Sequence, residues 1–174
     1  YPEREVRLYD LNDQVCAVWD YVIKASPEEI RKLPLIGPNE LVEDLNIHSE
    51  AKTLIGWWVN FATTSPRGRF SRGAVSFLEA KGVKGSSSLW GLQRREKSER
   101  IKHWTIEQKS FENIDNMKAY WFIDPPYQGG AGREYKHSEI NYDYLAKWSR
   151  EREGQVVVCE NSDSLQWLPF QPFR

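Results

Sequence analysis

The spacing of apolar positions changes along the first quarter of the chain. The residues around Val6 and Leu8 predict a short strand that ends at Asp10. From about Asp13 the spacing becomes that of an amphipathic helix. Its apolar side consists of Val15, Val18, Trp19, Val22 and Ile23. The sequence Ser26-Pro27-Glu28-Glu29 then predicts a second, short helix with a serine cap and a first-turn proline.

The middle of the chain has weaker periodicity. Residues 33–46 contain Pro34, Gly37 and Pro38, and they predict a surface connection. Ser49 is expected to cap a helix whose apolar positions are Leu54, Ile55, Trp58 and Phe61. Residues 63–91 are rich in Ser, Gly and Arg and are the least core-like segment. A polar helix is predicted for residues 92–103.

Strand-like and helix-like segments alternate in the remainder. Strands are predicted at residues 104–108, 119–123 and 155–159, with a helix at residues 142–152 and a short apolar ending at residues 165–173. Strands that alternate with helices indicate a mostly parallel, three-layer α/β sheet. We expect residues 1–174 to form a single domain.

Composition is that of a folded domain. The 174 residues are 40% hydrophobic and 28% charged, and no apolar run approaches the roughly 20 residues of a membrane helix. The start of the chain is not a signal peptide, so we expect a cytoplasmic protein without a membrane partner. Cys16 and Cys159 are predicted to be buried, reduced thiols, and the three histidines lack metal-ligand spacing, so no metal centre is expected.

The stretch Asp124-Pro125-Pro126-Tyr127 carries the clearest chemistry. It follows the apolar run at residues 119–123, at the end of a strand where open α/β sheets bind ligands. The Asp124 carboxylate and the Pro125 carbonyl offer two acceptors to an exocyclic amine, and the prolines add no N–H donors. The Tyr127 ring can lie on a flat heterocycle. The alternative is a strand that simply stops at a Pro-Pro turn.

This stretch resembles the catalytic motif of the amino-methyltransferases that use S-adenosylmethionine, most closely that of the Dam-like DNA adenine-N6 methyltransferases, which have an Asp-Pro-Pro-Tyr motif. Residues 5–12 look like that family's second strand with its terminal acid, and residues 154–161 look like the strand after the catalytic one. The resemblance implies a Rossmann-like class I methyltransferase sheet in a bacterial or phage-encoded enzyme. Residues 104–174 would be its catalytic half.

The resemblance also implies roles for individual residues. Asp124, Pro125, Pro126 and Tyr127 would hold and stack on the base that receives the methyl group. Asp10 would bind the ribose hydroxyls of S-adenosylmethionine, although capping of the following turn is an alternative that Asn12 and Asp13 fit better. Asp124 also borders the cofactor. Ser110 and Phe111 stand where relatives contact the cofactor adenine, but the acidic residue that relatives usually carry there is absent, and a plain strand-to-loop transition is the alternative.

Charge is concentrated in one segment. Ten basic and three acidic residues lie between Pro66 and Lys102. Such a segment attracts duplex DNA, and the resemblance places an inserted target-recognition segment here, at residues 62–103. The candidate DNA contacts are Arg67, Arg69, Arg72, Lys84, Arg94 and Arg95. The alternative for the arginines of the predicted helix is ion pairing on a solvated surface.

Two further expectations concern the segments around the motif. The glycine-rich loop at residues 128–137 is expected to close over a base flipped out of the duplex, with Tyr135, Lys136 and His137 as contacts, or else to be merely solvent-exposed. The resemblance implies a glycine-rich cofactor loop and a first strand upstream of Asp10, and residues 1–9 contain no glycine. We therefore expect a fragment whose cofactor site is completed by an N-terminal segment or a second chain.

Other functions remain open from the sequence. The same scaffold could modify cytosine N4 or a guanine N2 in ribosomal RNA. A non-catalytic nucleic-acid-binding relative would keep the fold without the cofactor. An interaction domain that uses exposed tryptophans such as Trp57 and Trp90 is a third class.

Overall fold

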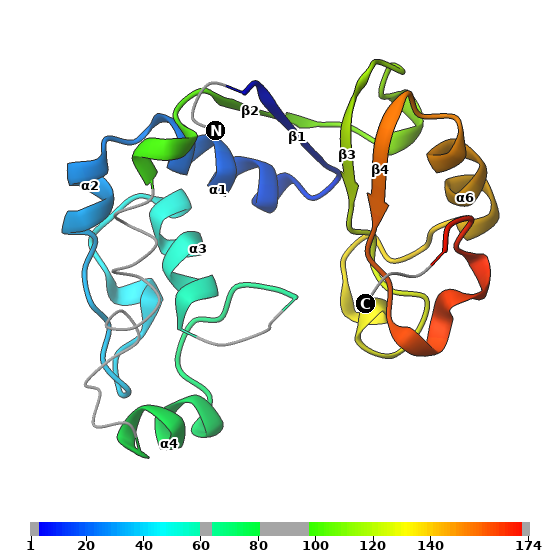
Figure 1. Cartoon of the computed structure of the whole chain (residues 1–174). Coiled ribbons are helices and arrows are strands. Elements are labelled where there is room, and N and C mark those ends of the chain that lie inside the picture. Colours follow the sequence, from blue (N-terminus) through cyan, green and yellow to red (C-terminus); the bar gives the residue numbers. More distant parts are fainter. Residues whose placement is uncertain (1–3, 60–63, 81–97, 172–174) are drawn as a thin grey trace. The chain divides into compact units, whose positions relative to one another are not determined.

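The structure is a computed structural model that describes residues 4–59, 64–80 and 98–171. The chain forms two compact units, Tyr1–Gln108 and Lys109–Arg174, and each is described by itself (Figure 1). None of the helices in the described ranges combines the length and the apolar character that crossing a bilayer requires.

The first unit contains one parallel strand pair and several short helices. Its elements are β1 (Val6–Asp10), α1 (Asp13–Lys24), α2 (Pro27–Lys32), η1 (Val42–Asp44), α3 (Ser49–Trp58), α4 (Arg72–Ala80), η3 (Ser98–Ile101) and β2 (Trp104–Gln108). Val6 lies opposite Trp104 and Asp10 opposite Gln108, so the two strands end at the same edge. Both strand ranges agree with the sequence prediction.

Helix α1 joins the strand pair to the helical core of this unit. Trp19 stacks on Trp104 of β2 with ring centroids 5.9 Å apart. On the core side, α1 packs against α3, and Ile30 of α2 and Ile55 of α3 are each 1% exposed. The apolar face predicted for α1 is therefore divided between the sheet and the helices, which explains why this helix has a broad apolar surface.

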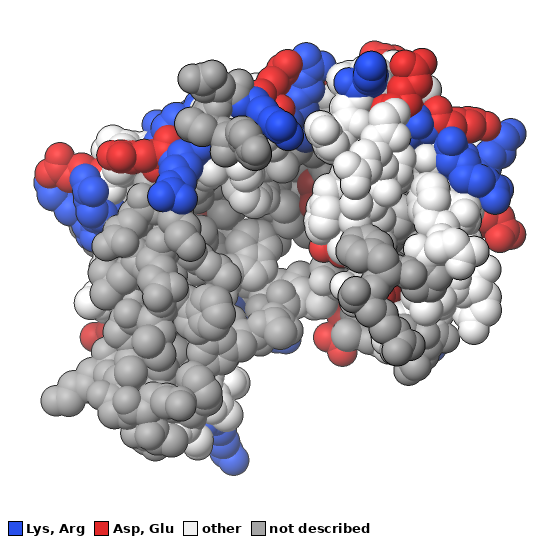
Figure 2. Space-filling model, viewed as in Figure 1, with Lys and Arg blue, Asp and Glu red and all other residues white. Residues whose placement is uncertain are grey.

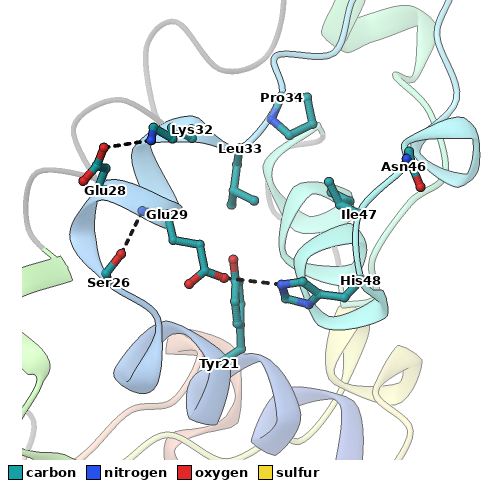
Figure 3. A pocket seen from close by; sticks show the side chains of 10 residues that line it. All are labelled: Tyr21, Ser26, Glu28, Glu29, Lys32, Leu33, Pro34, Asn46, Ile47 and His48. Atoms are coloured by element: carbon teal, nitrogen blue, oxygen red, sulfur yellow. Dashed lines mark hydrogen bonds and ion pairs between the residues drawn. The ribbon is translucent and has the colours of Figure 1, made fainter.

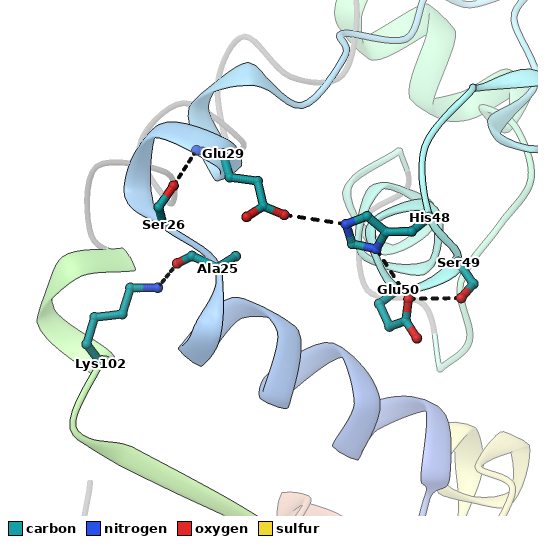
Figure 4. A network of polar contacts seen from close by, with 7 residues as sticks. All are labelled: Ala25, Ser26, Glu29, His48, Ser49, Glu50 and Lys102. Atoms are coloured by element: carbon teal, nitrogen blue, oxygen red, sulfur yellow. Dashed lines mark hydrogen bonds and ion pairs between the residues drawn. The ribbon is translucent and has the colours of Figure 1, made fainter.

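A polar network ties the ends of these helices together (Figure 4). The Lys102 ammonium group donates to the carbonyls of Val22, at 2.8 Å, and Ala25 at the end of α1. Burial lowers the pKa of Lys102. The His48 ring lies 3.4 Å from a Glu29 oxygen and 3.2 Å from a Glu50 oxygen, which links α2 to α3. These contacts fix the helix ends without adding apolar surface.

The predicted caps are confirmed at two helices and wrong at a third. The Asn12 side chain accepts from Gln14 N–H at the start of α1, and Ser26 accepts from Glu29 N–H at the start of α2. Helix α3 instead begins at Ser49, with His48 before it and no side-chain cap. The Ser49 hydroxyl donates to Glu50 at 2.9 Å, so it is engaged with a carboxylate rather than with the helix N–H groups.

Two segments predicted to be peripheral contribute to the core. Ile36 and Val42 of the expected surface connection are 1% and 5% exposed. Phe70 and Ala74 of the expected core-poor segment are 7% and 5% exposed. In both segments single apolar residues are buried between turn residues. These residues do not recur at a regular interval, so the sequence pattern does not predict their burial.

The second unit surrounds another parallel strand pair. Its elements are η4 (Phe111–Asn113), β3 (Ala119–Ile123), η5 (Gly130–Glu134), α6 (Tyr142–Arg150), β4 (Gly154–Val158) and η6 (Ser162–Trp167). Ala119 lies opposite Gly154 and Ile123 opposite Val158. Strand β4 thus begins and ends one residue earlier than predicted.

Helix α6 covers one face of this strand pair. Leu145 and Trp148 are 2% and 5% exposed and belong to one cluster with Trp121 and Ile123 of β3. The Trp121 and Trp148 rings meet edge to face, with centroids 5.6 Å apart. The Arg152 guanidinium lies 4.1 Å from the centre of the Trp148 ring, so it makes a cation–π contact with the aromatic cluster.

The α/β class and the parallel strands are confirmed, and the described strands form two sheets of two strands each. The three-layer Rossmann-like sheet stays a prediction.

Gly154 provides a stability test for the second unit. Its φ is +108°, and an added Cβ would overlap the carbonyl oxygen of Ala119. We expect Gly154→Ala to lower the free energy of unfolding by at least about 2 kcal/mol, measured by urea denaturation followed by circular dichroism. Gly130→Ala is the control, because Gly130 also has a positive φ, +52°, but has open space around it. Its cost should be only about 1 kcal/mol; equal costs would contradict the overlap.

Candidate functional site

The Asp124–Tyr127 turn leaves the sheet at the carboxyl end of β3. Strand β4 runs parallel to β3, so Cys159 and Glu160 leave the sheet at the same edge. The Cys159 N–H donates to the Ile123 carbonyl at 2.8 Å and extends the pairing to the residue before Asp124. This edge is where ligands bind in open α/β sheets. The predicted position of the motif at a strand end is therefore confirmed.

Three elements hold the turn in place. The Tyr142 hydroxyl of α6 donates to the Pro126 carbonyl at 2.7 Å. The Gln128 N–H donates to Glu160 at 3.2 Å, and the Ser164 hydroxyl of η6 donates to the Gln128 carbonyl at 3.1 Å. The turn is thus held at Pro126 and at Gln128 by hydrogen bonds with side chains that lie 16 to 36 residues further along the chain.

These bonds leave two neighbouring acceptors available. The carbonyls of Pro126 and Gln128 accept the bonds just described, and the Tyr127 carbonyl accepts from Gly129 N–H at 2.6 Å. Within the described part of the chain, no hydrogen bond reaches the Pro125 carbonyl. The turn therefore presents the Asp124 carboxylate and the Pro125 carbonyl, the pair of acceptors that the sequence predicted for an amine.

The electrostatics of the turn centre on Asp124. Partial burial raises the pKa of the Asp124 carboxyl, and a hydrogen bond from the Cys159 thiol opposes that rise. The negative charge of Asp124 is the main cause that raises the pKa of Tyr127. Tyr127 is 40% exposed, so its ring remains open to a flat ligand. A carboxylate with incomplete solvation is a stronger hydrogen-bond acceptor for a ligand amine than one in bulk water.

The glycine-rich segment after the motif is folded against the turn. The Gly132 N–H donates to the Gly129 carbonyl at 3.0 Å within η5. A Cβ on Gly132 would overlap the backbone of Tyr127, so only glycine fits this close approach. Within this segment Gly130–Glu134 form the short 3₁₀ helix η5, and the closure of the segment over a base stays a prediction. Lys136 and His137 follow it and are exposed.

Glu160 belongs to the site but was not among the residues predicted from the sequence. Its two carboxylate oxygens accept from Trp167 Nε1 at 2.6 Å, from Asn161 N–H at 2.6 Å and from Gln128 N–H at 3.2 Å. The signal was present, because Glu160 follows one strand as Asp124 follows its neighbour. Tyr142 and Ser164 had no comparable signal, since their partners are backbone atoms distant in sequence.

The predicted cofactor residues fall in both units. Asp10 ends β1 in the first unit, where one carboxylate oxygen accepts from Asn12 N–H at 2.7 Å. Asp10 thus shapes the turn, as the alternative proposed, while Asn12 caps the helix. No described residue is bonded to the second carboxylate oxygen of Asp10. This oxygen can accept a ribose hydroxyl.

Ser110 and Phe111 belong to the second unit, as Asp124 does. The Ser110 side chain makes no capping bond at η4. The Phe111 ring meets Trp148 edge to face, with centroids 5.4 Å apart, and lies 5.9 Å from the Tyr144 ring. Phe111 is therefore part of the aromatic cluster under α6 and keeps a partly exposed surface.

Three of the six DNA contacts predicted within residues 62–103 are described, and their side chains are exposed: Arg67, Arg69 and Arg72. Their backbone is anchored, because Arg67 N–H donates to the Gly56 carbonyl at 2.9 Å and Val42 N–H donates to the Gly68 carbonyl at 2.8 Å. Lys84, Arg94 and Arg95 lie outside the described residues. On the face drawn in Figure 2, basic and acidic side chains are interspersed.

A separate open pocket of about 560 Å³ lies in the first unit (Figure 3). Tyr21, Glu29 and His48 line it together with Leu33 and Ile47. Burial raises the pKa of the Tyr21 hydroxyl. None of the residues predicted from the sequence for the candidate site lines this pocket. In the described part of the chain no group of three or more His, Cys, Asp or Glu side chains is arranged to hold a metal ion.

Comparison of the sequence with protein-family models and with curated proteins found no match.

The bond from Tyr142 can be tested by deletion of its hydroxyl. We expect Tyr142→Phe to lower the free energy of unfolding by about 1 kcal/mol, because the Pro126 carbonyl loses its donor. Tyr144→Phe is the matched control on the same helix, since Tyr144 is 41% exposed and its hydroxyl bonds no described residue. The control should change stability by less than about 0.5 kcal/mol in urea denaturation. Equal effects would show that the Tyr142 hydroxyl does not hold the turn.

Proposed function

We propose that this protein belongs to a DNA methyltransferase system that transfers a methyl group from S-adenosylmethionine to the N6 amino group of adenine. The single observation that carries the proposal is the pair of acceptors at the carboxyl end of β3, the Asp124 carboxylate and the Pro125 carbonyl. The bonds made by Tyr142, Ser164 and Gly129 occupy the other carbonyls of the turn. The chain therefore presents acceptors matched to the two N–H donors of an amine.

Each residue of the turn has its own role in the proposed reaction. The two acceptors orient the amino group and turn its lone pair out of conjugation with the ring. The exposed Tyr127 ring stacks on the base and fixes its plane. S-adenosylmethionine supplies an electrophilic methyl group on sulfur. Catalysis by this chain then rests on position and electrostatics, with the partly desolvated Asp124 stabilising the positive charge that develops on the amine nitrogen.

Asp10 has a hydrogen-bond acceptor that suits the ribose of the cofactor. Asp10 keeps one carboxylate oxygen without a bond to the described residues, and it lies at the carboxyl end of a parallel strand. A carboxylate in that position binds ribose hydroxyls in nucleotide-binding folds. Ser110 offers a hydroxyl, and Phe111 offers a partly exposed ring edge for the adenine of the cofactor. We propose Asp10 in the first unit, and Ser110 and Phe111 in the second unit, as individual cofactor-binding residues.

The nucleic-acid partner is proposed from the exposed arginines. Arg67, Arg69 and Arg72 project from a segment that backbone bonds and the buried Phe70 hold on the core. Cations on a fixed backbone can contact successive phosphates of duplex DNA. Lys136 and His137 are exposed beyond η5 and are proposed to contact the strand from which the base is flipped, a step that costs a few kcal/mol.

The reaction is tested by nucleoside analysis. The chain is incubated with labelled S-adenosylmethionine and unmethylated duplex DNA, and we expect labelled N6-methyladenine. A label only on cytosine, or only on RNA, would contradict the adenine assignment. Tight DNA binding without any heat of cofactor binding in calorimetry would favour a non-catalytic binding protein.

Asp124 should be essential to that reaction. We expect Asp124→Ala to lower kcat at least about 10²-fold, because the amine loses a charged acceptor in the transition state. Asp124→Asn should also be slow, since its side chain is uncharged, yet it should unfold at the same urea concentration as the wild type or slightly higher. Asp115→Asn, an exposed carboxylate before β3, is the matched control. Full activity of Asp124→Ala would remove Asp124 from its proposed role.

The arginine contacts predict a salt effect. Replacement of Arg67, Arg69 and Arg72 by Gln should weaken DNA binding and reduce the slope of log K against log salt concentration by about 0.9 for each phosphate that is no longer neutralised. Lys32→Gln is the control, because Lys32 lies on another helix, α2, and is paired with Glu28 at 2.8 Å. An unchanged slope in the triple variant would place the DNA elsewhere.

A further inference from the structure

Cys159 is the residue beside Asp124 at the end of the strand pair. The register of β3 and β4 places Ile123 opposite Val158, so the next residues, Asp124 and Cys159, leave the sheet side by side. The 2.8 Å bond from Cys159 N–H to the Ile123 carbonyl fixes the backbone at that point. The side chains of these two neighbouring residues leave the same face of the strand pair, and each shifts the pKa of the other.

We propose that Cys159 is a positioning residue for the methyl transfer: its thiol holds one oxygen of the Asp124 carboxylate and directs the other oxygen toward the substrate amine. The inference rests on the proposed function. It assigns to a second residue the orientation of the group that binds the substrate. Without a donor on this side, the carboxylate could rotate about χ2, because terminal carboxylate torsions are broad.

A thiol suits this task better than a stronger donor. Sulfur is a weak hydrogen-bond donor, so it orients the carboxylate without much reduction of its strength as an acceptor for the amine. A serine hydroxyl would approach more closely and lower the pKa of Asp124 further. A short apolar residue would leave the orientation open. The expected order of activity is therefore wild type, then Cys159→Ser, then Cys159→Ala.

Asp124 and Cys159 each shift the pKa of the other, and these shifts support a contact between the two side chains. The thiol bond lowers the pKa of Asp124 against the larger effect of burial. The pKa of Cys159 is raised by burial first and by the charge of Asp124 second. Three other ionisable groups are near the pair: Tyr127, Tyr135 and Glu160. The charges of Asp124 and Cys159 both raise the pKa of Tyr127, and the charges of Tyr135 and Glu160 raise it as well.

The first experiment measures the contact without any methyl transfer. Cys16→Ser leaves Cys159 as the single thiol, and its rate of reaction with iodoacetamide is followed against pH by mass spectrometry. Loss of the Asp124 charge lowers the pKa of the thiol and increases the thiolate fraction. We expect Asp124→Asn to speed alkylation of Cys159 at least about twofold below the thiol pKa, and Asp115→Asn to leave it unchanged. An unchanged rate in Asp124→Asn would overturn the contact.

Cys16 provides a matched control within the same chain. Its pKa is also raised by burial and by an aspartate, Asp10, but its thiol lies 3.4 Å from the backbone carbonyl of Asp10 rather than on a carboxylate. In the Cys159→Ser background, the alkylation of Cys16 should not respond to Asp124→Asn. A parallel change in both thiols would indicate a general loss of structure and would overturn the interpretation.

The second experiment measures the role of the contact in catalysis. We expect Cys159→Ala to lower kcat about tenfold with little change in the KM for DNA, and Cys159→Ser to recover most of the loss. Removal of the donor raises the pKa of Asp124, so the acidic limb of the pH profile should move to higher pH in Cys159→Ala. Circular dichroism is the check that both variants fold.

The outcomes separate the two proposals. A fast-alkylating Asp124→Asn together with a tenfold slower, serine-rescued Cys159→Ala supports the positioning role. Normal kcat and an unmoved pH profile in Cys159→Ala would overturn that role while leaving the methyl transfer intact. A wild-type protein without methyl transfer would overturn the proposed function, and the alkylation experiment would still show whether the thiol contacts the carboxylate.

Discussion

The parallel alignment of β3 and β4 is the constraint from which the candidate site follows. Two parallel strands cannot be joined by a tight turn, so the chain crosses back through α6 before β4 begins. Packing of Trp148 on Trp121 holds that crossover on the sheet. Because the strands run in the same direction, Asp124, Cys159 and Glu160 leave the sheet at one edge. The site is thus a consequence of the strand register and not of a separate binding loop.

The same arrangement explains how a turn without regular structure keeps one conformation. Tyr142 comes from the first turn of α6, Glu160 from the segment just after β4, and Ser164 from η6. Each contributes one hydrogen bond worth about 1 kcal/mol. Gly132 adds a steric contact that only a residue without Cβ allows. The site is therefore held by several weak contacts from elements that the core positions.

Elements with strong local signals were predictable from the sequence, and tertiary contacts were not. The bounds of β1, β2 and β3 follow from apolar runs between polar residues, and the caps at Asn12 and Ser26 follow from local chemistry. The burial of Ile36 depends on which distant helix covers it, so its proline-rich surroundings were misleading. Strand β4 begins one residue early because Gly154 adopts a conformation whose pairing with Ala119 only glycine allows.

The two aspartates that end parallel strands show why the prolines matter to the chemistry. Asp10 uses one carboxylate oxygen to accept the N–H of the residue two positions later, Asn12, and so closes a turn on its own backbone. The equivalent residue after Asp124 is Pro126, which has no N–H to donate. Asp124 therefore cannot close the same turn, and its carboxylate is left for the proposed contacts with the Cys159 thiol and a ligand. The proline pair keeps the carboxylate available, while Tyr142 holds in place the turn that the aspartate can no longer stabilise itself.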